Sequence, residues 1–300
     1  MKSNETDREL SVPGPARIFF LHIPKTGGTT LTENFYRRFA PFGYLREVHE
    51  NPDAKLRRQI NRLPQWKLNH IRAILGHFHF GLHNLVPGDY HYVVLLREPR
   101  QRVQSLYCHI LNNQNHPQHK ALTSGDGLEL FLSGQLSEQS TNDQTRRLAG
   151  FPGVKKMEEK HYRVAVENIT NAKVSVGVTE RFDEYMTLLE QQIPELGDLS
   201  YPYRRNTRTG PPEQAITAKE TLRSIDAANH WDKKLYDTAV NVLDQRINQF
   251  GSQFNDLMRN FEERCQEKAQ NETNHRLCKR IKRSLQVRLR NQLRNLYFRC

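Results

Sequence analysis

The 300-residue sequence has no long apolar run, since no stretch approaches the roughly 20 residues that a membrane-spanning helix needs. Its cysteines show neither C-x-x-C spacing nor histidine partners at the intervals of a metal site. Residues 1–11 are charged and lack the apolar block of a signal peptide. These absences favour a cytoplasmic protein with reduced, scattered thiols. The four cysteines are Cys108, Cys265, Cys278 and Cys300.

The sequence also lacks the phosphate-binding motif G-x-x-x-x-G-K-[ST] and an apolar strand that ends in a magnesium-binding aspartate. Both absences argue against a P-loop kinase. No carboxylate cluster implies a metal ion, so we expect metal-independent chemistry. With 36% hydrophobic residues, the chain is long enough to bury one sizeable core.

Short apolar runs alternate with helical stretches along most of the chain. We expect strands over residues 17–23, 71–75, 91–96 and 173–178. We expect helices over 29–39, 53–63, 180–192 and from Ile216 onward, with long loops over 112–127 and 201–212. Strands that are separated by helices predict an α/β fold, in which helices flank a central parallel sheet.

The segment 17–30 (RIFFLHIPKTGGTT) has the pattern of a strand, a tight loop and a helix start. Paired glycines let the backbone approach a ligand closely, and a helix start offers unpaired N–H groups to an anion. A lysine adds positive charge, and three threonines add hydroxyl donors. The segment predicts a phosphate-binding loop, and the alternative is an ordinary strand–helix turn with a solvated lysine. The loop residues are Lys25, Thr26, Gly27, Gly28, Thr29 and Thr30.

A second candidate anion site lies in the segment 95–107 (LLREPRQRVQSLY). Arg97 follows an apolar strand and offers a planar fork that suits a phosphate, and Ser105 on the next helix offers another donor. The alternative is that Arg97 pairs with Glu98 or caps a carboxyl end.

Three strands thus bring a lysine loop, an imidazole and a guanidinium to the same edge of the predicted sheet. Lys25 follows the first strand, His77 the second and Arg97 the third. Ligands of open α/β sheets bind outside the carboxyl ends of the strands. We therefore expect one site that contains all three side chains.

These segments resemble the P-loop sulfotransferases, most closely the branch with heparan sulfate 2-O-sulfotransferase and related bacterial proteins. The resemblance rests on HIPKTGGTT (22–30), the GH pair (76–77), LLREPRQRVQSLY (95–107) and SVGVTERFDEYMTLLE (175–190). We accordingly expect a sulfotransferase domain over 17–250 with the P-loop sulfotransferase fold. A flexible N-terminus (1–16) would precede it, and a basic helical C-terminal extension (251–300) would follow it.

The resemblance implies that the chain moves a sulfuryl group from 3′-phosphoadenosine 5′-phosphosulfate (PAPS) to an acceptor hydroxyl and releases PAP. The loop from Lys25 to Thr30 would hold the 5′-phosphosulfate, and Arg97 and Ser105 would hold the 3′-phosphate. A carbohydrate acceptor is implied by the resemblance alone. The alternative function is an inactive module that binds PAP or a polyanion, and no specific nucleic-acid partner is expected.

His77 matches the position of the family's catalytic base, and an imidazole suits this role because its ordinary pKa of about 6.5 lies near neutrality. In an extended segment GHFHF (76–80), His77 and His79 would face the same side. His79 is therefore the alternative base, and a purely structural histidine is the other interpretation. We expect in-line transfer, with Lys25 neutralising charge on the bridging oxygen.

The positive charge of the chain is concentrated near its C-terminus. Of the net charge of +12, residues 276–300 carry nine Lys or Arg and no Asp or Glu, which leaves +3 elsewhere. Apolar residues recur there at helical spacing and predict a basic amphipathic helix. Such a helix could bind an anionic membrane surface, an acidic glycan or a second copy of the chain, or pack on the protein's own core. The apolar residues are Leu277, Ile281, Leu285, Leu289, Leu293 and Leu296.

Overall fold

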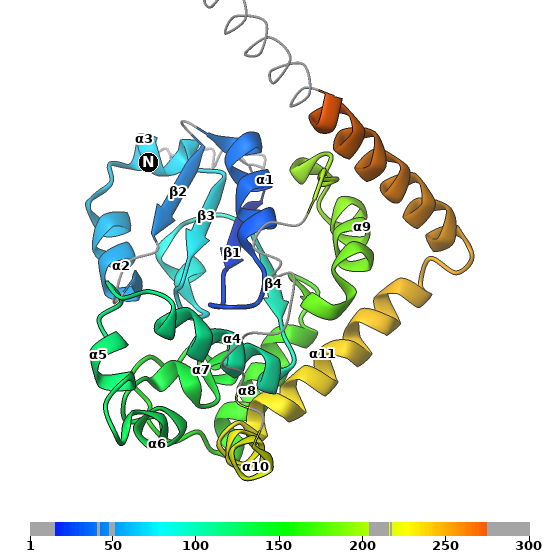
Figure 1. The fold of residues 1–300 in the computed structure, drawn as a ribbon. Helices are drawn as coiled ribbons and strands as arrows, with labels where there is room; N and C mark the ends of the chain where they lie inside the picture. The colour runs from blue at the N-terminus through cyan, green and yellow to red at the C-terminus, as the bar shows by residue number, and fades with distance from the viewer. Residues whose placement is uncertain (1–15, 41–42, 48–51, 204–215, 217, 275–300) are drawn as a thin grey trace, which may run out of the picture.

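A computed structural model describes residues 16–40, 43–47, 52–203, 216 and 218–274 of the chain. Five parallel strands form one sheet in the order β2-β3-β1-β4-β5, and helices surround it (Figure 1). The predicted fold class, a central parallel sheet flanked by helices, is confirmed. The strands are β1 (Arg17–Leu21), β2 (Tyr44–Glu47), β3 (Ala73–Gly76), β4 (Tyr90–Leu96) and β5 (Val174–Val178).

The first strand, β1, lies in the middle of the sheet and is buried along its whole length. Its last residue, Leu21, pairs with Gly76 of β3 on one side and with Val94 of β4 on the other. From β1 the chain builds the sheet first toward β3 and β2 and then toward β4 and β5. The crevice at such a change of direction is the usual ligand site of this fold class.

The helices around the sheet differ in length and in the strand that they contact. Helices α8, α9 and α11 pack against β5, whereas α1 contacts β3 and α2 contacts β2. The longer ones are α1 (Thr29–Phe39), α2 (Pro52–Arg62), α4 (Pro99–Leu111), α8 (Glu159–Thr170), α9 (Phe182–Gln192), α10 (Lys219–Ala228) and α11 (His230–Asn248). The short ones are α3 (Gln65–His70), α5 (His119–Leu122), α6 (Gly127–Leu132) and α7 (Asp143–Ala149).

Most predicted elements are present, and the errors fall on short or polar segments. The helix predicted over 29–39 has these bounds in the structure. The edge strand β2 was not predicted, and α5 lies within the stretch 112–127 that was predicted to be a loop. Of the second predicted loop, residues 204–212 lie outside the described residues.

A further helix over residues 253–274 follows α11. Its Phe261 is fully buried, with a ring centroid 6.2 Å from that of Tyr201. On the same helix, Arg264 forms an ion pair with Glu190 of α9 at 2.6 Å. This part of the C-terminal region therefore packs on the main core. The basic stripe predicted for 276–300 lies outside the described residues.

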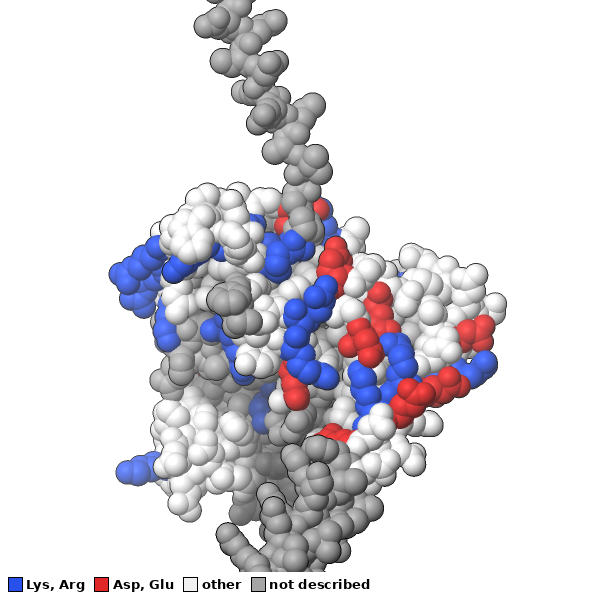
Figure 2. Space-filling view, turned by 90° about the horizontal axis from the view of Figure 1, so that it is seen from above, with Lys and Arg blue, Asp and Glu red and all other residues white. Residues whose placement is uncertain are grey.

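Positive charge also lies on the described part of the molecule. Figure 2 shows Lys and Arg side chains on the side of α2 and α3, without Asp or Glu next to them. Of the basic residues in α2 and α3, Arg58, Arg62 and Lys67 are exposed. On the side of the helix 253–274, positive and negative side chains alternate (Figure 2). The basic character of the protein is thus not confined to residues 276–300.

Candidate active site

The loop between β1 and α1 turns sharply, and two of its residues have a positive φ. Lys25 has φ 71° and Gly27 has φ 80°. The hydroxyl of Thr26 is buried and donates to the carbonyl of Ile23 at 2.9 Å, which closes the turn. A lysine in this conformation is strained by roughly 1–3 kcal/mol, and such strain gathers at functional sites.

Gly28 precedes α1 and lies against the ring of His22. A Cβ atom at Gly28 would be 2.6 Å from Cδ2 of His22 and 2.9 Å from Cζ of Phe20, closer than real Cβ atoms approach. The two rings are stacked, with centroids 5.2 Å apart. Only glycine therefore fits at this helix start. The first turn of α1 has no acidic side chain, so nothing there opposes an anion.

Thr179, which follows β5, links this loop to the sheet. Its Oγ1 lies 2.5 Å from the carbonyl oxygen of Thr26 and 2.8 Å from that of Leu96. Its single hydroxyl proton can serve one of these acceptors at a time. The sequence analysis did not assign a role to this threonine, because its partners lie 153 and 83 residues away in the chain.

Arg97 lies next to the loop, at the end of β4. Its Nη1 donates to the carbonyl of Lys25 at 3.2 Å, whereas its buried Nε has no hydrogen-bond partner. Burial lowers the pKa of Arg97, but a guanidinium stays charged at neutral pH. The side chain of Glu98 accepts from the backbone N–H of Gln101 and caps α4. Arg97 is therefore a half-buried cation with an unused donor at its buried Nε, and Ser105 lies half-buried on the helix that follows.

His77 follows β3, and its ring makes one informative contact. Its Nδ1 lies 2.6 Å from the backbone carbonyl oxygen of His22. A carbonyl can only accept a hydrogen bond, so Nδ1 carries the proton and the neutral ring keeps its lone pair on Nε2. In the described part of the chain no residue forms a hydrogen bond with this Nε2, so the lone pair is available to a ligand.

The surroundings of His77 keep the imidazole neutral. Burial first, and then the positive charge of Arg147, lower the pKa of His77 to about 4. Arg46 of β2 acts in the same direction, and Asp143 opposes it. At neutral pH the ring is therefore an unprotonated base.

The residues after His77 differ in burial. Phe78 is fully buried and packs edge-on against Phe19, with ring centroids 6.5 Å apart. His79 is half-buried, as His77 is.

The structure brings His77, Lys25 and Arg97 together at the carboxyl ends of β3, β1 and β4. His77 contacts the backbone carbonyl of His22, and Arg97 contacts that of Lys25, so both side chains are joined to the loop that follows β1.

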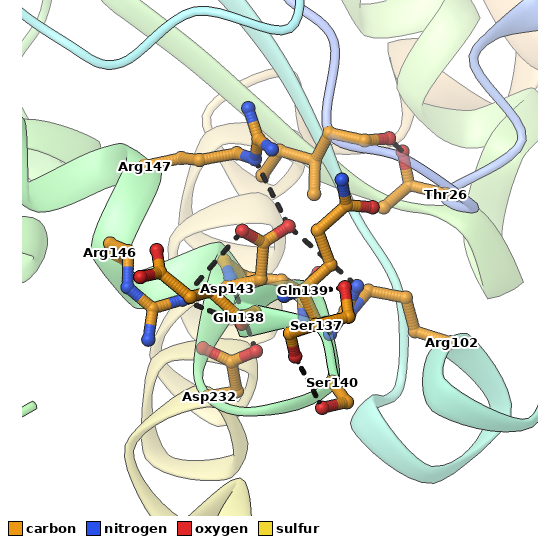
Figure 3. A network of polar contacts seen from close by, with 12 residues as sticks. Thr26, Arg102, Ser137, Glu138, Gln139, Ser140, Asp143, Arg146, Arg147 and Asp232 are labelled. Atoms are coloured by element: carbon orange, nitrogen blue, oxygen red, sulfur yellow. Dashed lines mark hydrogen bonds and ion pairs between the residues drawn. The ribbon is translucent and has the colours of Figure 1, made fainter. Parts of the chain in front are cut away.

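A buried ionic network lies beneath this edge (Figure 3). Its centre is the carboxylate of Asp143 on α7, which is 3.0 Å from Nε of Arg147 and 3.8 Å from both Arg102 and Arg146. Burial would raise the pKa of Asp143, but the three arginines hold it below its ordinary value. A buried side chain stays charged only where an opposite charge lies beside it, so Asp143 and its arginines depend on one another.

Sequence analysis missed the segment 140–150 (STNDQTRRLAG) that forms this network. Every residue of α7 is buried, although five of its seven side chains are polar or charged. In a sequence, such a run of polar side chains is typical of a solvated surface. Its burial here depends on partners elsewhere in the chain, which the local sequence does not reveal. The only local signal was Gly150, whose φ of 77° ends the helix.

Two negative findings concern the described residues only. In the described part of the chain, no group of three or more His, Cys, Asp or Glu side chains could hold a metal ion. Within the same residues, no helix is both long enough and apolar enough to cross a membrane.

Comparison with known proteins finds a matching family model and ten matching chains among the solved structures. The model of the sulfotransferase family matches residues 8–299. Among solved structures, the chain is similar to mouse sulfotransferase SULT7A1 complexed with PAP, at 16% sequence identity and a TM-score of 0.38. That alignment covers 84% of this chain and 89% of the mouse chain. A search of curated proteins finds no significant match.

Proposed function

The chain belongs to the sulfotransferase family, and we propose that it transfers a sulfuryl group from PAPS to an acceptor hydroxyl, with His77 as the base. One observation carries this proposal: the proton of His77 is held on Nδ1 by the carbonyl of His22, so that Nε2 keeps its lone pair as an acceptor. A base needs both this free lone pair and a place beside the donor site.

Two features of the site support PAPS as the donor. The tight loop from Lys25 to Thr30 leads into the start of α1, where backbone N–H groups favour an anion such as the 5′-phosphosulfate. The unpaired, buried Nε of Arg97 needs an acceptor, which the 3′-phosphate of PAPS would provide. We propose that Ser105 adds one further hydrogen bond to that phosphate.

PAPS, when bound, would supply an activated sulfuryl group whose leaving oxygen belongs to a phosphate. In the proposed in-line step, Nε2 of His77 accepts the proton of the acceptor hydroxyl. The hydroxyl oxygen forms a bond to sulfur as the bond between sulfur and the phosphate oxygen breaks, and that oxygen keeps the electron pair. Lys25 would neutralise the charge that develops there.

We propose that this step needs no metal ion. A sulfuryl group carries less negative charge than a phosphoryl dianion, so the lysine of the loop and the dipole of α1 can balance what develops. A carbohydrate acceptor and a cytoplasmic location remain part of the proposal, the first by family resemblance and the second because the cysteines are scattered.

The competing function is a module that binds PAP or a polyanion without catalysis. Both functions require the donor site, but only the enzyme requires a neutral His77 with a free Nε2. The geometry of that ring therefore favours the enzyme.

Calorimetric titration with PAP, and with adenosine 5′-phosphate as the analogue without the 3′-phosphate, tests the donor site. We expect PAP to bind about ten- to a hundredfold more tightly, since a charge-assisted hydrogen bond is worth roughly 1.5–3 kcal/mol. Arg97→Ala should remove this preference, and EDTA should leave PAP affinity unchanged. Equal affinities for the two nucleotides would refute the assignment of Arg97.

A further inference from the structure

Helix α7 contacts the backbone of the proposed base and of the residue three positions after it. Nη1 of Arg147 donates to the carbonyl of His77, and the N–H of Phe80 donates to the carbonyl of Arg147 at 2.8 Å. The segment from His77 to Phe80 is thus attached to one residue of α7 at each end. Arg147 in turn is fixed by the carboxylate of Asp143, 3.0 Å from its Nε.

The same helix also holds the backbone of the proposed 3′-phosphate residue. The side-chain amide of Gln144 accepts from the N–H of Arg97 at 2.9 Å and donates to its carbonyl at 2.9 Å. Both backbone groups of Arg97 are therefore satisfied by one side chain. This pairing fixes the backbone from which the guanidinium of Arg97 extends.

Helix α7 is itself anchored from outside the site. The buried carboxylate of Asp232 on α11 accepts from the backbone N–H groups of Gln144 at 3.2 Å and of Thr145 at 2.7 Å. Arg146 of the same helix donates to the carbonyls of Val154 and Glu138, each at 2.8 Å, which are not part of the proposed site. The two adjacent arginines thus share the carboxylate of Asp143 but donate to different backbone carbonyls (Figure 3).

We propose that α7 is the positioning element of the site, in which Arg147 orients His77 toward the acceptor and Gln144 orients Arg97 toward the donor. This inference rests on the proposed function, because it assigns to α7 the alignment of the base with the donor. Neither residue is proposed to touch a substrate.

Arg147 acts on His77 through both geometry and charge. The ring of His77 is fixed at Nδ1 by His22 and its backbone is fixed by Arg147, so the direction of Nε2 is determined at two points. The charged and titratable groups that face this ring are Arg147 and Asp143 on α7, Arg46 on β2 and His22 after β1. A lysine at position 147 would keep the charge but could not bind Asp143 and the His77 carbonyl together.

Three variants of the full chain test the proposal by steady-state sulfuryl transfer and PAP titration. Arg147→Lys should lower kcat about ten- to a hundredfold, as expected when a catalytic group is misplaced by about 1 Å, and leave PAP affinity within about twofold. Gln144→Met should instead weaken PAP about tenfold with little change in the affinity for adenosine 5′-phosphate. Arg146→Lys is the matched control, since it alters an equally buried arginine of the same helix, and should change neither quantity.

A readout without turnover separates this inference from the proposed function. Long-range ¹H–¹⁵N NMR spectra of the imidazoles report which nitrogen of His77 carries the proton. The wild-type chain should show the Nδ1–H form alone, and Arg147→Lys should add the other tautomer, whether or not an acceptor is known. Absence of transfer and of PAP binding in the wild type would refute the proposed function.

Two results would overturn the positioning role. In the first, Arg147→Lys keeps the wild-type kcat and the wild-type tautomer of His77, and Gln144→Met keeps the wild-type PAP affinity. The other is an equal loss in Arg146→Lys, which would show that only the stability of α7 matters. If Arg147→Lys does not fold, Asp143→Asn releases Arg147 from its anchor and replaces it in the same measurements.

Discussion

Nδ1 of His77 lies 2.6 Å from the backbone carbonyl oxygen of His22, so the loop that follows β1 determines the tautomer of the residue that follows β3. The two rings also face each other, with centroids 4.8 Å apart. Since the carbonyl belongs to the backbone, this control does not depend on the side chain at position 22. The proposed donor loop and the proposed base are therefore linked directly.

The first prediction concerns His77 itself. His77→Ala should lower the rate of sulfuryl transfer about 10²–10⁴-fold and leave PAP affinity nearly unchanged, because a general base acts on the acceptor. The two quantities are measured by single-turnover kinetics and by calorimetry. His79→Ala is the matched variant, and near-normal turnover is expected for it. The reverse outcome would make His79 the base, and full activity in both would contradict the mechanism.

The sequence was sufficient to predict the parts of the site that local patterns encode. The apolar run of β1, the paired glycines and the strand before Arg97 each have a signature within about a dozen residues. Parallel strands then bring their carboxyl ends together, which placed Lys25, His77 and Arg97 at one edge without knowledge of the structure.

The parts that could not be predicted depend on contacts between distant residues. Gln144 is 47 residues from Arg97, and Arg147 is 70 residues from His77. A polar helix such as α7 is buried only because Asp232 and the surrounding arginines satisfy it, and no window of the sequence contains both partners. The strand β2 was missed because its four residues are too few to show alternation.

The second prediction is a loss of stability in mild acid. Burial holds the pKa of His77 and of His91 at about 4, and that of His22 well below its ordinary value. The unfolded chain takes up these protons near pH 6.5, so between about pH 6.5 and 4 it binds more protons than the folded chain. The free energy of unfolding should therefore fall as the pH falls through this window.

Urea denaturation at pH 7.5, 6 and 5 measures this slope. His91→Gln should make the slope shallower, because it removes one of the imidazoles whose pKa is lowered in the folded chain. A midpoint that does not change with pH would contradict the prediction.

The third prediction concerns the close approach at Gly28. Gly28→Ala places a Cβ atom 2.6 Å from the ring of His22, which we expect to cost roughly 1–3 kcal/mol of folding free energy, as overpacking does. The double variant with His22→Ala should recover part of this loss in a double-mutant cycle. Gly125→Ala is the control, because nothing lies within 4 Å of a Cβ atom there. Equal stability of the two single variants would mean that the loop moves freely to admit a methyl group.

The last prediction concerns residues 276–300, whose basic amphipathic pattern lies outside the described residues. We propose that this segment mediates association, and that deletion of residues 275–300 leaves PAP affinity unchanged. Binding to anionic liposomes or to an acidic polysaccharide should be lost in the deletion variant. In the full chain it should weaken as salt rises from 0.1 to 1 M, because the Debye length falls from about 10 to about 3 Å.

Self-association through the apolar stripe that includes Leu277 and Ile281 should instead survive high salt, since apolar burial is not screened. Three measurements at both salt concentrations therefore distinguish a membrane, a glycan and a second copy of the chain as partners. They are sedimentation with liposomes, polysaccharide binding and oligomeric mass. If all three measurements are the same with and without the segment, and only the melting temperature falls, the segment packs on the protein's own core. That outcome would refute a role in association, because a helix whose apolar side is covered by its own protein has no surface left for a partner.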